Sequence, residues 1–275
     1  MENHPMRPTF GIEMECNIRY VRAEIDWSLF KEQEMYQVWK DHSFMPMKKK
    51  SEWAIRSLLY EVLTKEGIET NKPPIEKGYD RWTIEEDGSI EPVELDGKKA
   101  PGFRYFDTGI ISRVLNVDKE GLSEVRKAIS IINKTFTVVT NKSTGLHVHI
   151  GNRKNGFTFL TLRRFSQLVT AFEHLIRFII AEWRWNEARV LWDDESVTMF
   201  CKEVSAPGKG LPLAAVDVFE RLQLLEGANT EEALFDLMSH GGGRDYAYNF
   251  SNLRSWRNSS KKTIEFRQHE GTYNA

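Results

Sequence analysis

Alternating polar and apolar residues mark several short stretches of the chain as β-strands. In residues 10–21, Ile12 and Met14 fall on one face of the predicted strand. Glu13 and Glu15 fall on the other face. Further strands are predicted over residues 81–92, where the strand runs into an Asp-Gly turn, and over 103–112, 144–152, 246–253 and 263–270. We expect the last two of these stretches to pair with each other.

Apolar residues recur at helical spacing in the longer segments between these strands. Residues 51–67 show the pattern most clearly, with Ser51 placed to cap the start and Gly67 to end the helix. The other predicted helices cover residues 119–135, 157–185, 213–227 and 229–240, and loops are predicted over 205–212 and 239–245. Helices and strands mix without strict alternation, and neither a repeat nor a linker is visible. We therefore expect one α+β domain over residues 1–275 with a largely antiparallel sheet.

Charge and cysteine content narrow the range of partners. The chain of 275 residues carries a formal net charge of −2, so no strong attraction to nucleic acid or to membranes is expected. Its two cysteines, Cys16 and Cys201, are too few for a disulfide framework, which indicates a reducing compartment. The N-terminal residues lack the apolar core of a secretory signal, and charged residues interrupt the most apolar stretch, 157–185. We expect a cytoplasmic protein without a nucleic-acid or membrane partner; the pattern does not indicate an oligomeric state.

Three of the predicted strands place ionisable side chains on one face. These side chains are Glu13 and Glu15 in the first strand, His147 and His149 in the second, and Glu265, Arg267 and His269 in the third. If the three strands belong to one sheet, one of its faces gathers carboxylates, imidazoles and a guanidinium. Clustered carboxylates raise one another's pKa unless a cation lies between them, and Glu-rich sites with imidazole suit Mg²⁺ or Mn²⁺. Metal ions together with an arginine are what phosphoryl transfer needs.

Each of these pairs also has an ordinary structural explanation. Glu13 and Glu15 alone are typical of the solvent face of an edge strand, and Glu265 with Arg267 is typical of a cross-strand ion pair. Four other kinds of site lack their signatures in this chain. There is no P-loop, no GxGxxG dinucleotide-binding fingerprint after a strand, no Cys-x-x-Cys pair for a zinc ribbon, and no GxSxG motif for a serine nucleophile. Cys16 points to the apolar face of its strand, which favours a place in the core.

Five blocks of the sequence, in this order, resemble the putative amidoligase family: FGIEMEC, DGSI, ISRVL, TGLHVHIG and TIEFRQHEGT. The matching blocks run from about residue 10 to residue 272, and the last two are the most specific. That family is grouped with glutamine synthetases and glutamate–cysteine ligases, the carboxylate–amine ligases. The resemblance implies a glutamine-synthetase-like catalytic fold, in which a curved, largely antiparallel sheet holds ATP and divalent metal on its concave face and packs helices on the other.

The resemblance also implies a reaction and its cofactors. With ATP and Mg²⁺ (or Mn²⁺), the carboxylate of a small molecule or peptide is phosphorylated, and an amine then displaces phosphate to form an amide. The alternatives are a phosphotransferase on the same scaffold, acting on a small nitrogenous acceptor, and a catalytically impaired binding or scaffold descendant. A metal-dependent hydrolase using His147 and His149 would need further His or Asp ligands at supporting spacing, which we do not find.

The resemblance assigns roles residue by residue. It implies metal ligands at Glu13, Glu15, Glu265 and His147, cofactor-binding residues at His147, His149, Arg267 and Ser89, and catalytic residues at Arg267, Glu265 and Asp87. Asp87 and Ser89 form a D-x-S motif that is implied to place a substrate, with an exposed turn as the alternative. His269 and Glu270 match the family without an implied role. Arg163, Arg164, Glu173 and Arg184 are candidates for the pocket rim, although a solvated helix face is the more ordinary explanation.

The sequence departs from the family pattern at two places. Three positions before Ser112, where the family commonly has an acidic residue, this chain has Gly109. Asp107 lies two residues earlier on the same strand face, and one metal ligand is missing unless Asp107 replaces it. The chain also stops soon after Thr272, so we expect the C-terminal helical extension of the family to be absent.

Overall fold

The computed structural model describes residues 7–20, 47–72, 78–91, 93–95, 98–99, 104–177, 218–238, 248–254 and 261–270. The loops predicted at 205–212 and 239–245, and the part of the predicted helix 157–185 beyond residue 177, lie outside these ranges. The chain separates into two compact units. Unit 1 is Met1–Gly11 with Gly145–Glu270, and unit 2 is Ile12–Thr144 with Gly271–Ala275.

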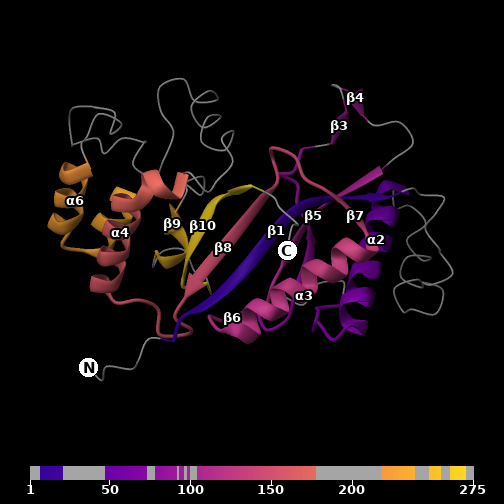
Figure 1. Cartoon of the computed structure of the whole chain (residues 1–275), viewed down its shortest axis with the longest axis horizontal. Coiled ribbons are helices and arrows are strands. Elements are labelled where there is room, and N and C mark those ends of the chain that lie inside the picture. The colour runs from indigo at the N-terminus through magenta and orange to yellow at the C-terminus, as the bar shows by residue number, and fades with distance from the viewer. Residues whose placement is uncertain are drawn as a thin grey trace. The chain divides into compact units, whose positions relative to one another are not determined.

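Unit 2 combines antiparallel strands with two of the helices labelled in Figure 1. Its elements are β1 (Thr9–Tyr20, which begins in unit 1), α2 (Met47–Lys65), β2 (Thr83–Glu86), β3 (Glu94–Leu95), β4 (Lys98–Lys99), β5 (Arg104–Ile111), β6 (Leu115–Asn116), α3 (Lys119–Thr135) and β7 (Thr137–Val139). β5 lies between β1 and β2 and runs antiparallel to both. β6 and β7 also pair with β1, while β3 and β4 pair only with each other.

The strand register in unit 2 separates apolar from polar side chains. Met14 on β1 lies opposite Ile110 on β5, which lies opposite Ile84 on β2, and all three are buried. α2 contacts β2 and α3, and it buries Leu59 and Leu63 completely. The alternation predicted for the first strand is therefore confirmed, because its apolar positions form part of the core and its glutamates take the other face.

The two helices of unit 2 begin and end for different reasons. α3 matches its prediction, and Asp118 caps it by accepting a hydrogen bond from the backbone N–H of Gly121. α2 starts at Met47, so the prediction that Ser51 caps it was wrong; the Met-Lys-Lys-Lys stretch before Ser51 consists of good helix formers. Gly67 does end α2, since it adopts φ +80° and the N–H of Ile68 reaches back to the carbonyl of Leu63.

Unit 1 packs helices against a second set of antiparallel strands. Its elements are β8 (Gly145–Gly151), α4 (Phe159–Arg177), α6 (Val218–Gly227), α7 (Glu231–Met238), β9 (Tyr248–Asn249), the short 3₁₀ helix η5 (Ser251–Leu253) and β10 (Thr263–Glu270). β10 lies between β8 and β9, as Figure 1 shows, so the predicted pairing of the last two strands is confirmed. The core joins strand and helix residues: Leu162, Val169, Leu225, Leu234, Phe235, Met238, Tyr248, Phe250 and Ile264.

A β-bulge in β10 changes the face of one predicted site residue. Phe266 lies opposite Val148, but the register then shifts, and His269 lies opposite Leu146. Two residues of β10 therefore lie opposite a single residue of β8, His147. Beyond this bulge, each residue of β10 points to the face opposite the one that strict alternation predicts. The expectation that His269 shares a face with Glu265 was wrong, because His269 lies on the face of Leu146.

The mixture of helices with open antiparallel sheet confirms the expected α+β class. The finer expectation of a glutamine-synthetase-like arrangement stays a prediction. In the described part of the chain, no helix has both the length and the apolar character that crossing a membrane requires.

Candidate functional site

Unit 2 brings three carboxylates together on the polar face of its strands. The register sets Glu15 opposite Gly109 on β5, and Gly109 opposite Glu85 on β2. Glu13 lies on the same face of β1 as Glu15, two residues earlier. Each of Glu13, Glu15 and Asp87 offers one oxygen, and these three oxygens lie within 4.8 Å of one another. We call these three residues the carboxylate cluster.

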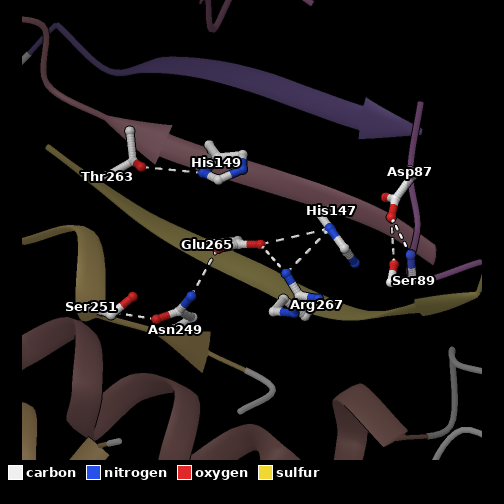
Figure 2. Close-up of polar contacts among 9 residues, drawn as sticks. All are labelled: Asp87, Ser89, His147, His149, Asn249, Ser251, Thr263, Glu265 and Arg267. Atoms are coloured by element: carbon white, nitrogen blue, oxygen red, sulfur yellow. Dashed lines mark hydrogen bonds and ion pairs between the residues drawn. The ribbon is translucent and has the colours of Figure 1, made fainter. Parts of the chain in front are cut away.

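The turn after β2 holds Asp87 in place. Its backbone N–H donates to the carbonyl of Asp107 at 3.1 Å. Its Oδ1 accepts hydrogen bonds from the backbone N–H of Ser89 at 2.9 Å and from the Ser89 hydroxyl at 2.6 Å, as Figure 2 shows. This is an Asx turn, which fixes the aspartate side chain against its own backbone. The Ser89 hydroxyl therefore orients Asp87. The predicted role of Ser89 in binding the cofactor stays a prediction.

The donor set of the carboxylate cluster fits a hard divalent cation. Three carboxylate oxygens within 4.8 Å repel one another unless a positive charge lies between them. Mg²⁺ and Mn²⁺ prefer oxygen ligands, and Mg²⁺ commonly combines a few carboxylates with water and phosphate oxygens. Glu13, Glu15 and Asp87 could therefore hold such an ion.

Unit 1 gathers its ionisable side chains around Glu265. On the neighbouring strands Glu265 lies opposite His149 and Asn249. Its Oε1 accepts a hydrogen bond from Nη1 of Arg267 at 2.5 Å and lies 3.6 Å from Nδ1 of His147. Its Oε2 accepts from Nδ2 of Asn249 at 2.8 Å. Figure 2 shows these contacts converging on one carboxylate. We call the five residues the Glu265 cluster.

Glu265 is charged although it is almost fully buried, with 2% of its surface exposed. Burial alone would raise the pKa of Glu265, but the guanidinium of Arg267, followed by the imidazoles of His149 and His147, outweighs burial and holds this pKa below its ordinary value. The carboxylate is therefore ionised at neutral pH, and it can hold the guanidinium in a fixed position.

Arg267 reaches from this buried carboxylate toward solvent. Its side chain is 26% exposed, against 3% for the side chain of Glu265. Within the described residues, its contacts with Glu265 and with Nδ1 of His147 (3.4 Å) both use Nη1. A guanidinium has five N–H donors, so Nη2 and Nε can serve an oxyanion. A planar, charged donor group of this kind suits phosphate or carboxylate.

The two histidines of β8 lie where the alternation placed them. His147 and His149 are both buried, on the face of Glu265. Nδ1 of His149 lies 3.2 Å from the hydroxyl oxygen of Thr263, the first residue of β10, and this contact orients the ring. Their predicted contacts with metal or nucleotide stay predictions.

Sequence reasoning missed two buried asparagines. Asn249 is fully buried, and besides contacting Glu265 its Oδ1 accepts from the backbone N–H of Ser251 at 2.8 Å. Asn17 lies on the face of Glu15 and opposite Asp107 on β5. It is 0% exposed, and neither of its amide atoms has a hydrogen-bond partner among the described residues. In both cases the sequence offered one indication, an asparagine among apolar residues of a predicted strand.

The remaining candidates from the sequence have other contacts or lie outside the described residues. Arg163 and Arg164 on α4 both contact Glu226 on α6. The Arg164 side chain is 64% exposed, which supports the ordinary explanation for this residue, whereas the Arg163 side chain is only 20% exposed. The side chain of Glu173 and all of Arg184 lie outside the described part of the chain, as does the side chain of Glu270. Cys16 is fully buried on the apolar face of β1, so its predicted core place is confirmed.

The chain thus carries a carboxylate cluster in unit 2, whose donor set fits a hard cation, and a buried Glu–Arg–His group in unit 1, whose guanidinium suits an oxyanion. The family model described as "Putative amidoligase enzyme" matches residues 7–275. The chain belongs to this family, which supports an enzyme of the ligase type. Neither the curated proteins nor the solved structures contain a significant match to the chain.

Proposed function

We propose that this protein is an ATP- and Mg²⁺-dependent carboxylate–amine ligase that acts through an acyl phosphate. Membership of the putative amidoligase family over residues 7–275 is the observation that carries the proposal. Each cluster supports it separately, because hard-cation ligands and a fixed guanidinium are both needed for phosphoryl transfer. The substrates in this proposal are the carboxylate and the amine of small molecules or peptides.

In unit 1, Arg267 is the residue proposed to contact the transferring phosphoryl group. Its Nη1 is held by Glu265, so the guanidinium loses little freedom when its other donors meet an oxyanion. Asn249 holds the second oxygen of Glu265 and thereby acts as a positioning residue. Each carboxylate oxygen can accept a second contact, so Glu265 remains a proposed metal ligand. His147 is also a proposed metal ligand, and His149 is proposed to contact the nucleotide.

In unit 2, the carboxylate cluster is proposed to hold the divalent cation. When bound, that cation neutralises charge on phosphate oxygens. Glu13 and Glu15 come from a regular strand, while Asp87 comes from a turn that Ser89 fixes. Sites held on regular elements and supported by hydrogen bonds keep their geometry with little reorganisation.

The proposed reaction has two steps. An oxygen of the substrate carboxylate attacks the γ-phosphorus of ATP, and ADP leaves. The amine nitrogen then attacks the acyl carbon, the bond to phosphate breaks, and the nitrogen loses a proton. The balance is one amide, one ADP and one phosphate for each ATP. Arg267 stabilises the negative charge that spreads over the phosphoryl oxygens during the first step.

The test is incubation with ATP, Mg²⁺ and a pool of amino acids and amines, followed by mass spectrometry. The proposal expects ADP, phosphate and a product lighter than its two precursors by one water. Arg267→Ala should lower the rate by about 100-fold or more, whereas Arg126→Ala, at an exposed position on α3, should keep the rate of the parent. Phosphorylated product without amide would instead favour a phosphotransferase. Absence of nucleotide binding would favour a non-catalytic binding or scaffold protein. Turnover by Arg267→Ala at the rate of the parent would show that Arg267 is not part of the site.

A further inference from the structure

Gly109 stands in the middle of the carboxylate face of unit 2. It lies on β5 between Glu15 on one neighbouring strand and Glu85 on the other. A Cβ atom built on Gly109 would lie 3.9 Å from an oxygen of Asp87 and 3.9 Å from an oxygen of Glu13; of the described atoms, these are the nearest. A side chain at position 109 would therefore enter the carboxylate cluster.

The backbone gives no reason for a glycine at this position. Among the described glycines, only Gly67 and Gly156 have a positive φ, so Gly109 has a conformation that any residue adopts. A Cβ at 3.9 Å from its nearest described neighbours is in ordinary van der Waals contact. Glycine inside a strand weakens it, and one common reason for keeping it is the close approach of another group.

Asn17 gives an independent indication that a ligand approaches this face. It follows Glu15 by two residues on the same face, and its partner across the strands is Asp107, two residues before Gly109. Asn17 and Gly109 are thus diagonal neighbours on one face. The Asn17 amide is completely buried, and in the described part of the chain neither its Nδ2 nor its Oδ1 has a partner. A buried amide that lacks partners is costly, so such groups usually meet a ligand or water.

We propose that Gly109 keeps a coordination position of the cation held by Glu13, Glu15 and Asp87 open for an anionic oxygen of the substrate, and that Asn17 donates to this ligand. The proposal rests on the proposed function and adds the substrate-facing side of the metal site. A cation such as Mg²⁺ takes about six oxygen ligands, so three carboxylates that each supply one oxygen leave positions for further oxygen ligands. The anionic oxygen belongs either to a nucleotide phosphate or to the carboxylate substrate.

The experiment measures binding by calorimetry, without turnover. Mn²⁺ is titrated into the full chain, and two anions, AMP-PNP and acetate, are then titrated with saturating Mn²⁺ and again in EDTA. In the parent, Mn²⁺ should tighten binding of at least one anion by about tenfold or more. The anion that responds identifies the source of the oxygen.

Variants at position 109 separate metal binding from anion binding. Gly109→Ala should bind Mn²⁺ within about twofold of the parent but lose most of the coupling to the anion, since its methyl group fills the open position. Gly109→Asp should bind Mn²⁺ about tenfold more tightly, because it adds a carboxylate, and should also lose the coupling. Gly227→Ala, an exposed glycine with nothing described within 4 Å of its Cβ, is the control and should behave like the parent.

The outcomes distinguish this proposal from the function on which it rests. If the parent binds no Mn²⁺, both fail. If the parent couples Mn²⁺ to an anion and Gly109→Ala does so equally, the assignment of Gly109 fails while the proposed function stands. Asn17→Leu provides a second variant should the position-109 variants fold poorly. It should keep Mn²⁺ affinity and lose anion affinity, and unchanged anion affinity would overturn the role of Asn17.

Discussion

One substitution turns the hydrogen bond between Asn249 and Glu265 into a repulsion. Nδ2 of Asn249 donates to Glu265 at 2.8 Å, and both side chains are buried. Asn249→Asp keeps the shape of the side chain and the acceptor for Ser251, but it replaces the donor with a charged acceptor. At the 2.8 Å separation of this bond, two unit charges repel by about 6 kcal/mol at an effective dielectric constant near 20. The carboxyl pair should therefore keep one proton.

The cost of that proton sets the expected loss of stability. A carboxyl group with an ordinary pKa of about 4 takes up a proton at pH 7 at a cost of about 4 kcal/mol. Once protonated, the pair regains a donor in place of the one that Asn249 supplied. We therefore expect Asn249→Asp to lower the free energy of unfolding by about 4 kcal/mol at pH 7.

This loss should shrink as the solution becomes more acidic. The folded variant binds one proton more than the unfolded chain at pH values between the ordinary carboxyl pKa and the raised pKa of the pair. Its deficit against the parent should therefore fall by about 1.4 kcal/mol for each pH unit between pH 7 and pH 5.

Urea unfolding in EDTA, at three pH values across that range, measures the effect. Asn229→Asp adds the same charge at an exposed position and serves as the control. A deficit that does not change with pH would refute the reasoning, as would a loss below about 1 kcal/mol at neutral pH.

Urea unfolding of three further variants tests a buried amide, an ion pair and a backbone conformation. Asn17→Leu should raise the free energy of unfolding by about 1–3 kcal/mol, because it removes two buried atoms without described partners; a loss of stability would contradict this. Burial alone would raise the pKa of Glu124, but hydrogen bonds from Arg113 and Trp82 hold this pKa below its ordinary value. Glu124→Gln should therefore cost about 1 kcal/mol at neutral pH and progressively less as pH falls below about 4.5, where the parent loses the same contribution. Gly67→Ala should cost about 1 kcal/mol, because alanine must adopt φ +80°, and no loss would argue against that backbone conformation.

Alternation made the strand faces predictable from the sequence. Ile12 and Met14 against Glu13 and Glu15 gave the faces of β1 correctly, because each strand residue points to the side opposite its neighbour. The same rule placed His147 and His149 beside Glu265. It failed for His269, because a β-bulge depends on how two distant strands pair and leaves no clear mark in one of them.

The partners of each site residue were less predictable, because they come from distant parts of the chain. Asn249 reaches Glu265 only through the pairing of β9 with β10. Asp87 joins the carboxylate cluster because the turn after β2 folds back on β5. The start of α2 at Met47 was missed for a local reason, since Ser51 can either cap a helix or lie within its first turns.

The most direct test of the account follows the oxygen atoms of the carboxylate substrate. The protein is incubated with ATP, Mg²⁺ and amino acids whose carboxylates carry oxygen-18, and both the condensed product and the inorganic phosphate are analysed by mass spectrometry. An acyl phosphate intermediate transfers one labelled oxygen to phosphate for each amide formed, so labelled phosphate and product should appear in equal amounts. Unlabelled phosphate, or phosphate release without an amide, would contradict the central claim.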